Sequence, residues 1–574
     1  MKRCFFLYLI VFYFFSSCSS DTYDIIVNCA SDPDFINIEN VVSSRDSRNY
    51  PYLTEKSEKE WLILFYIDAD NYKNDQLFQE MAQICKGLRN IYRYDGITPK
   101  KEYNNVTAVG LWDGFNKDTK YTPNYYMPLS YLFEFQYPQQ ENITQILSTY
   151  KGTPEKLNFL KDVSNDVIND PDDNWLGSYH EVNMADKNTL DKFLKWALKK
   201  YNNDNSKRVI IVMSGEGGGS FGKETGSYVP SSRAINRDMS SDSYYLSMRD
   251  VHDALENNNF TESNKLDLLV MEQDYSASLE DLYEIKDVVK ATLASPSSLP
   301  GSSVDMNYFI QSLRKNSTIY SIGTEAVNVF ANKNYTKYPE TSYGDIPDKN
   351  QGMATLTFID MSKIKELGDK VNKLADGIYK TNIHNENYLV DQKYTFLECM
   401  DNKENISYEY GLLKPDDYAK DFITDYAMFY KSWYRHKIDR YDYFWGHFYM
   451  FDLGYFCEKS YTVASKAGRD GILEIIEPAD NIRQFLEETI ISSWRNGTNS
   501  KSGIYTTLSN SNIYGITITG PAKVNNGSKK LYMQPYNFST FTYKDYKKDG
   551  MHNWYDVLHT LYEEQFQENP YLED

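Results

Sequence analysis

The sequence is poor in cysteine and histidine, and its cysteines match no metal-binding spacing. Only 6 cysteines and 7 histidines occur among 574 residues. Cys85 lies in the amphipathic pattern LFQEMAQICKGL, which predicts a buried and inert thiol. Export would permit individual disulfides. No metal-binding spacing and no disulfide framework is found among the four cysteines that follow the N-terminal segment, Cys29, Cys85, Cys399 and Cys457.

An excess of basic residues is also missing. The chain has 61 Lys and Arg against 81 Asp and Glu, so its formal net charge is -20. Binding to a phosphate backbone rests on clustered Lys and Arg, and no such cluster is evident. The composition therefore excludes nucleic acid as a partner.

The N-terminal apolar run, Cys4 to Phe15, is too short for a membrane span of about 20 residues. Two basic residues precede the run and small residues follow it, which is typical of an export signal. FSSC at 15–18 resembles a relaxed bacterial lipobox with Cys18 as the lipidated residue; an ordinary secretory signal is the alternative. We predict a signal peptide at 1–17, then a lipidated N-terminus and polar tether at 18–57, on a bacterial membrane, with the outer membrane or cell surface favoured.

The remaining chain alternates apolar strands with helical patterns. Hydrophobic residues make up 41% and aromatic residues 15%, enough for a large core. Because the strands are continuously apolar and separated by helices, they predict an α/β fold with a mostly parallel sheet flanked by helices. This core is predicted at 58–345, and a Tyr-rich α+β region at 346–574 packs on it. The strands of the core are WLILFYI at 61–67, VTAVGLW at 106–112, VIIVM at 209–213 and LDLLVM at 266–271, with a short strand at 291–294.

Functional residues of such a sheet belong at the carboxyl ends of its strands. Asp68 and Asp70 follow the first strand, a glycine-rich loop with Glu216 follows the strand at 209–213, and EQDYSAS follows the next at 272–278. The glycine loop nearly fits the phosphate-binding pattern, but Glu224 stands where a magnesium-binding hydroxyl is needed. An exported protein also has little access to ATP, so we predict no nucleotide binding.

Six ordered segments resemble the clostripain family of cysteine peptidases, and together they cover most of the chain. The resemblance implies a caspase-like fold with a His-Cys dyad. The segments are EWLILFYIDADN at 60–71, EVNMADKNTLDKFLKWALKKY at 181–201, VIIVMSGEGGG at 209–219, KLDLLVMEQDYSASLEDLYEIKDVVKATLASPSSLPG at 265–301, TLTFIDMSKIKEL at 355–367 and YGITITGP at 514–521.

The resemblance places the histidine of the family at Glu216 and its cysteine at Asp274. Gly215 stands where the family has aspartate before the histidine, and Glu272 keeps an acid two residues before the cysteine position. Ser278 and Glu280 also fit. The candidate cleft implied by this comparison comprises Gly215, Glu216, Gly217, Gly218, Gly219, Glu272, Gln273, Asp274, Ser276 and Ser278.

A cysteine peptidase needs a thiolate and an imidazole, and neither occurs in the two loops. The hydroxyls of Ser276 and Ser278 are close in sequence, but no histidine accompanies them, and His180 and His252 lie away from the predicted strand ends. We therefore predict no catalytic residues and no cysteine-peptidase turnover. The hypothesis is a pseudopeptidase that binds peptide or protein; the alternative is an active hydrolase that uses Glu216 and Asp274, or a peptidase whose nucleophile has moved.

Two carboxylates at adjacent strand ends repel each other unless something intervenes. Glu216 and Asp274 could share a proton, hold a divalent cation such as calcium, meet a Lys or Arg side chain, or splay into water. No other cofactor is expected. The sequence leaves these four outcomes open, together with the oligomeric state.

Overall fold

The computed structural model describes residues 43–71, 73–93, 98–114, 130–135, 164–168, 179–217, 219–221, 232–237, 245–296, 299, 304–337, 355–383, 450–466, 473–495, 514–519, 552–554 and 556–557. Within this part of the chain, a nine-stranded sheet has the order β1-β15-β13-β12-β11-β7-β2-β3-β4. The five central strands are parallel, and the outer strands run antiparallel to their inner neighbours. In chain order these strands are β1 (Ser43–Ser44), β2 (Trp61–Ala69), β3 (Val106–Gly114), β4 (Tyr131–Phe135), β7 (Arg208–Ser214), β11 (Leu268–Glu272), β12 (Ala291–Ala294), β13 (Thr355–Asp360) and β15 (Ile490–Arg495).

Helices cover both faces of the sheet because its central strands are apolar on both sides. Every residue of β2 and β7 is buried. Alternate residues of β2 enter two separate cores: Leu62 and Leu64 face one, and Ile63 and Phe65 face the other. The mostly parallel α/β fold predicted from continuous apolar strands is therefore confirmed.

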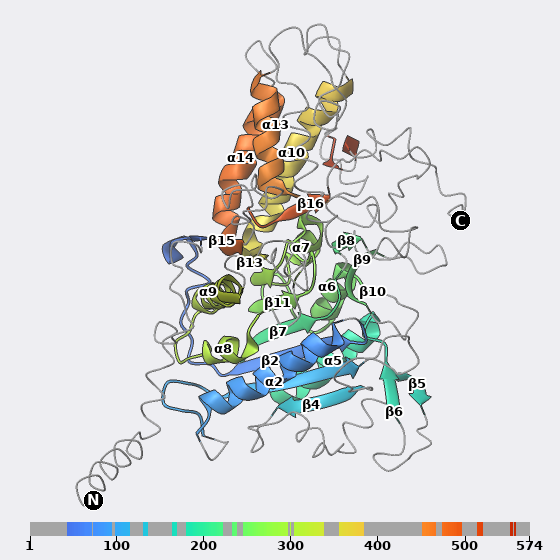
Figure 1. Cartoon of the computed structure of the whole chain (residues 1–574), viewed down its shortest axis with the longest axis vertical. Coiled ribbons are helices and arrows are strands. Elements are labelled where there is room, and N and C mark those ends of the chain that lie inside the picture. Colours follow the sequence, from blue (N-terminus) through green and yellow to red (C-terminus); the bar gives the residue numbers. More distant parts are fainter. Residues whose placement is uncertain are drawn as a thin grey trace, which may run out of the picture.

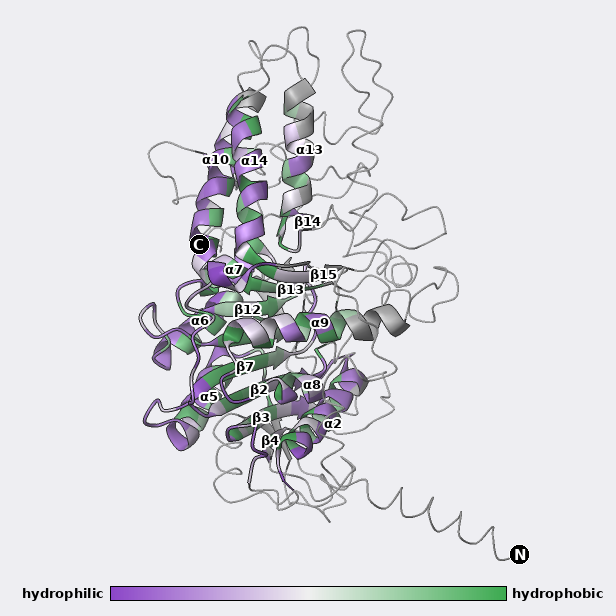
Figure 2. Ribbon diagram, turned by 90° about the vertical axis from the view of Figure 1, so that its left-hand side faces the viewer, coloured by the Kyte–Doolittle hydropathy of each residue, from purple (hydrophilic) through white to green (hydrophobic). Residues whose placement is uncertain are grey.

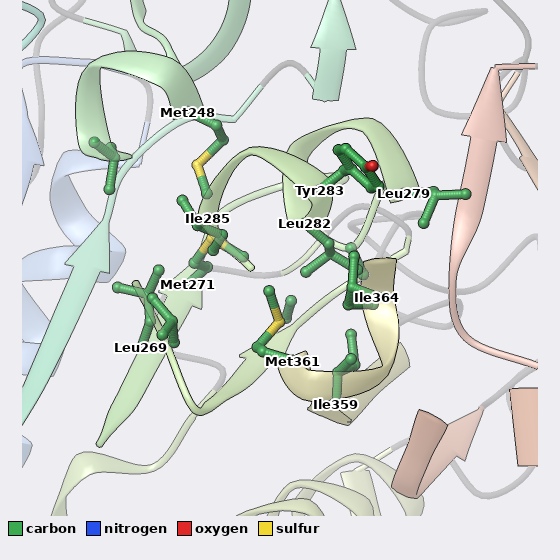
Figure 3. Packing of buried hydrophobic residues seen from close by; sticks show 14 of the residues in the cluster. Met248, Leu269, Met271, Leu279, Leu282, Tyr283, Ile285, Ile359, Met361 and Ile364 are labelled. Atoms are coloured by element: carbon green, nitrogen blue, oxygen red, sulfur yellow. The ribbon is translucent and has the colours of Figure 1, made fainter. Parts of the chain in front are cut away.

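The first core contains α5 (Lys187–Tyr201), α6 (Met248–Asn257) and α7 (Leu279–Ile285). The second contains α2 (Asn74–Ile91), α8 (Met306–Gln311) and α9 (Ile319–Lys337). Figure 3 shows part of the first core, where Leu282 of α7 lies near Met271 of β11 and Met361. The strands that end at the candidate site are thus held from both sides.

The C-terminal region supplies β13 and β15 to the sheet in addition to packing on it. Three helices, α10 (Ile364–Ile383), α13 (Leu453–Lys466) and α14 (Leu473–Thr489), rise together beyond this end of the sheet (Figures 1 and 2). The sequence near 480–494 predicts a helix, and this prediction is wrong in its second part, because IISSWR forms β15 with Ile490 and Ile491 buried. A further helix is predicted near 417–434, which lies outside the described residues.

Short strands and turns complete the described structure. β14 (Met450–Asp452) pairs with β16 (Thr517–Thr519). β16 lies within the segment YGITITGP at 514–521, for which the sequence predicts a strand. The other short elements are β5 (Ser164–Ile168), β6 (Tyr179–Val182), β8 (Gly219–Phe221), β9 (Ser232–Arg237), β10 (Tyr245–Leu246) and the 3-10 turns η3 (Ser47–Asn49) and η5 (Met361–Lys363).

The folded body begins earlier than the boundary drawn at residue 58. Ser43 pairs with Ser493 in β15, and the side chains of Tyr50 and Leu53 are buried in the core. The Tyr50 hydroxyl donates to the Glu488 carbonyl at 3.0 Å. Residues 43–57 of the predicted tether therefore belong largely to the body, while the signal segment and Cys18 lie outside the described residues. None of the described helices has the length and apolar character of a membrane span.

Candidate functional site

The two loops singled out in the sequence lie side by side. β7 and β11 are neighbouring parallel strands, and Ser214 at the end of one is in register with Glu272 at the end of the other. A Cβ atom on Gly217 would lie 2.3 Å from the Asp274 carbonyl oxygen and 2.7 Å from its nitrogen. The expectation that Glu216 and Asp274 follow neighbouring parallel strands is confirmed, and Gly217 is required by the contact between the two backbones.

Asp274 has a lysine as its partner. Lys73 Nζ lies 3.0 Å from Asp274 Oδ1, and the two side chains are 11% and 2% exposed. The backbone of Leu299 contacts both groups: its N–H donates to Asp274 Oδ1 at 2.6 Å, and its carbonyl accepts from Lys73 Nζ at 3.1 Å. The sequence left four outcomes open for this carboxylate. The one found for Asp274 is an ion pair with a lysine side chain.

Lys73 reaches this position from the loop after β2. Asn71 Oδ1 accepts from the Lys73 backbone N–H at 2.9 Å, and α2 begins at the next residue. Sequence reasoning noted Asp68, which lies in β2, and Asp70 in this loop, and missed Lys73. The position of Lys73 after β2 was the available signal. Since β7 lies between β2 and β11, a long side chain that follows β2 can cross the end of β7 and reach the loop after β11.

Glu216 lies on the strand end between these two groups. It is 8% exposed, and Gly215 before it is also buried. Gly219 begins β8, and Gly218 lies outside the described residues. Three consecutive strand ends, those of β2, β7 and β11, thus carry Lys73, Glu216 and Asp274 in that order.

A second carboxyl pair lies at the same edge and was not foreseen. Burial of Glu80 of α2, together with the negative charge of the neighbouring Glu272, raises the pKa of Glu80 well above its ordinary value. Ser214 Oγ donates to Glu80 at 2.8 Å, and the Val304 N–H donates to Glu272. Both side chains are buried. The raised pKa favours the protonated form of Glu80 beside Glu272.

The hydroxyls of Ser276 and Ser278 are engaged in the backbone architecture. Ser276 Oγ donates to the Gln273 carbonyl at 3.0 Å and accepts from the Ser295 N–H at 3.1 Å. Ser278 caps α7, donating to Asp281 Oδ2 at 2.6 Å and accepting from the Asp281 N–H at 3.1 Å. Neither of these contacts provides an imidazole base.

The histidines named in the sequence analysis do not supply such a base in the described contacts. His252 is buried on α6, and its Nδ1 lies 3.3 Å from Asp253. His180 lies in β6, and its side chain is outside the described part of the structure.

The loop that carries Asp274 and the buried Gln273 is held in one conformation. Tyr275 has φ 58, in the left-handed region that costs a residue with a side chain about 1 kcal/mol or more. The Ala277 N–H donates to the Ser295 carbonyl at 2.8 Å, and the Ala277 carbonyl accepts from the Thr517 N–H of β16 at 3.0 Å. The C-terminal region therefore closes over this loop.

A cation site is not found in the described residues. No group of three or more His, Cys, Asp or Glu side chains in this part of the chain is placed to hold a metal ion.

Comparisons with known proteins give a family and several similar structures. The clostripain family model, peptidase C11, matches residues 137–558. A secreted C11 cysteine protease from Bacteroides thetaiotaomicron, solved with an irreversible peptide inhibitor, is 12% identical over 84% of this chain and 97% of that chain, with a TM-score of 0.46. An inactive zymogen C11 protease from Parabacteroides distasonis is 12% identical over 82% and 93% of the two chains, with a TM-score of 0.41. The search of curated proteins gave no match.

Proposed function

The chain belongs to the clostripain family, and on that premise we propose that it is an exported, lipid-anchored member without cysteine-peptidase activity that binds peptide or protein. The carrying observation is the Lys73–Asp274 ion pair. The resemblance assigns the cysteine of the family to Asp274, so a buried carboxylate with a lysine partner stands where a thiolate would attack.

Loss of both dyad groups removes the chemistry of the peptidase. General acid-base catalysis contributes about 10²- to 10⁴-fold, and without a nucleophile only binding and oxyanion stabilisation are left. Glu216 cannot take over the role of the imidazole, because position 274 carries no thiol from which it could accept a proton.

The alternative of a hydrolase with two carboxylates has less support. That chemistry needs one acid with a raised pKa and a second acid that is free to act on the substrate. Asp274 is held by Lys73 and by the Leu299 N–H. A relocated serine nucleophile is also disfavoured, because Ser276 and Ser278 donate to a backbone carbonyl and to Asp281.

The activity test uses the chain without its signal segment and fluorogenic peptides with Arg, Lys or other residues before the cleaved bond. We expect no thiol-dependent turnover with or without calcium, and no labelling by a cysteine-directed peptide inhibitor. The secreted Bacteroides thetaiotaomicron protease serves as the active control. Turnover that is lost in Ser276→Ala, Ser278→Ala or Asp274→Ala would contradict the proposal.

The binding test uses the same peptides without the fluorogenic group and with a fluorescent label. An anisotropy increase that saturates with protein concentration supports a peptide site. If the anisotropy does not saturate with any of the peptides, the result contradicts the proposed peptide binding.

Export and anchoring rest on the N-terminal sequence. The short apolar run followed by FSSC at 15–18 favours lipidation of Cys18. Cys18→Ser should move the protein from the membrane fraction to the soluble fraction and abolish incorporation of labelled fatty acid. Unchanged fractionation, with no label in the native protein, would indicate a plain secreted protein.

A further inference from the structure

We propose that Lys73 and Asp274 become joined by an intramolecular isopeptide bond, with Glu216 as the acid that transfers the protons. The bond would link Lys73 Nζ to the side-chain carbonyl carbon of Asp274. It goes beyond the proposed function, and it depends on the geometry of three strand ends rather than on peptide binding.

The two reacting groups are already in contact. Lys73 Nζ lies 3.0 Å from Asp274 Oδ1, so the amine is in hydrogen-bond contact with the carboxyl group whose carbon it would attack. Both residues are fixed in place: Lys73 immediately precedes α2, and Asp274 precedes the left-handed Tyr275. The amine and the carboxyl group therefore meet in one orientation.

The ion pair is nearly closed to water, with exposed fractions of 11% for Lys73 and 2% for Asp274. The proposed reaction begins with transfer of one proton from the ammonium to the carboxylate, which gives the amine and the carboxylic acid that condense.

Leu299 and Glu216 supply the remaining parts of the reaction. The Leu299 carbonyl accepts from Lys73 Nζ and orients the amine, while the Leu299 N–H donates to Asp274 Oδ1 and would stabilise the oxyanion of the intermediate. Glu216 is buried at the end of β7, the strand between β2 and β11. It therefore lies on the strand end that the lysine side chain crosses.

The reaction balances without a further reagent. The nitrogen lone pair attacks the carboxyl carbon, and Glu216 takes a proton from the nitrogen. Glu216 then returns this proton to the departing hydroxyl group as the carbon–oxygen bond breaks. The products are an amide and one water molecule, and no atom is oxidised or reduced. The cross-link would join residues separated by 201 positions, so it would tie the loop after β2 to the loop after β11.

The test is the intact mass, under denaturing conditions, of the chain produced without its signal segment and without Cys18. We expect a mass lower by one water molecule than the mass calculated for that shortened sequence, and a branched peptide joining Lys73 to Asp274 after proteolysis. A mass equal to the calculated one, with no branched peptide, would overturn the proposal whatever the peptidase assays show.

Three variants assign the roles. Lys73→Arg keeps the positive charge without a reactive amine and should show the full sequence mass. Asp274→Asn should still react, but with loss of ammonia in place of water. Glu216→Gln should retain the fold, checked by circular dichroism, and leave most of the chain uncrosslinked; complete cross-linking in this variant would overturn the role of Glu216.

Discussion

Gly217 is the residue at which the two loops of the site touch. Its missing side chain leaves room for the Asp274 backbone, whose oxygen would lie 2.3 Å from a Cβ atom. Gly217→Ala should therefore lower the free energy of unfolding by about 1–3 kcal/mol, the usual cost of overpacking. Urea unfolding measures this loss. Lys195→Ala on the exposed face of α5 is the control, and equal midpoints for the two variants would show that the loops can separate without cost.

The pKa of Glu80 makes the stability of the protein dependent on pH. Burial and the charge of Glu272 raise this pKa in the folded state. The stabilising effect of the folded-state proton is complete below the ordinary glutamate value of about 4.3. As the pH rises above that value, the unfolded chain loses its proton first, so stability falls until the folded pKa is passed.

Glu80→Gln should weaken this dependence, because an amide keeps a donor for Glu272 and carries no titrating proton. The loss of unfolding free energy with rising pH, at most about 1.4 kcal/mol per pH unit for one group, should become smaller above pH 4.3. Thermal unfolding across this range is the measurement, with the exposed Glu366→Gln as control. A slope identical in Glu80→Gln and native protein would assign the proton to another group.

At the scale of elements, the central strands are the part that the sequence specifies best. Nine consecutive buried residues in β2 and seven in β7 leave no alternative to a sheet covered on both faces. The register of β7 with β11 then follows from their adjacency and places both loops at one edge. The helix predicted at 480–494 failed because its end is decided by a partner strand, β13, that is distant in sequence.

The site was predictable in position and only partly in chemistry. Glu216 and Asp274 could be located because they follow apolar strands directly. The partner of Asp274 and that of Glu272 could not, because Lys73 and Glu80 approach from α2 and its preceding loop. Pairings of this kind depend on the directions of side chains that meet across three strands. These directions cannot be predicted from the residues next to each side chain in the sequence.

A buried carboxylate of β14 holds the residues that lead into β16. Asp452 is buried and accepts from the backbone N–H groups of Tyr514 and Gly515 at 2.8 and 2.7 Å. Asp452→Ala leaves both N–H donors without this acceptor. It should lower the free energy of unfolding by about 2–3 kcal/mol or more. Hydrogen exchange should accelerate at Thr517, whose N–H donates to Ala277. Asp452→Asn, which keeps one oxygen acceptor, should show a smaller effect; unchanged exchange in the alanine variant would mean that β16 is held by other contacts.

At the scale of the whole molecule, the N-terminal segment 43–57 closes the outer edge of the sheet. Tyr50 and Leu53 enter the second core, and the Leu53 carbonyl accepts from the Tyr320 N–H at 3.0 Å. A chain shortened to begin at residue 58 should unfold at a lower temperature than one that begins at residue 43, because it exposes this core. Differential scanning calorimetry compares the two. Equal unfolding temperatures would show that residues 43–57 do not stabilise the fold, and the boundary of the folded body would then lie at residue 58.

The pairing of Ser43 with Ser493 also constrains the order in which the protein can be completed during synthesis. The ribosome releases Ser43 and Ser44 long before β15 exists, so β1 has no partner strand until then. Closure of β1 on β15 and of β16 on the Asp274 loop both need residues from the last part of the chain. The nascent protein therefore cannot reach its native state from its N-terminal half alone, and the sheet stays incomplete until the last part of the chain is available.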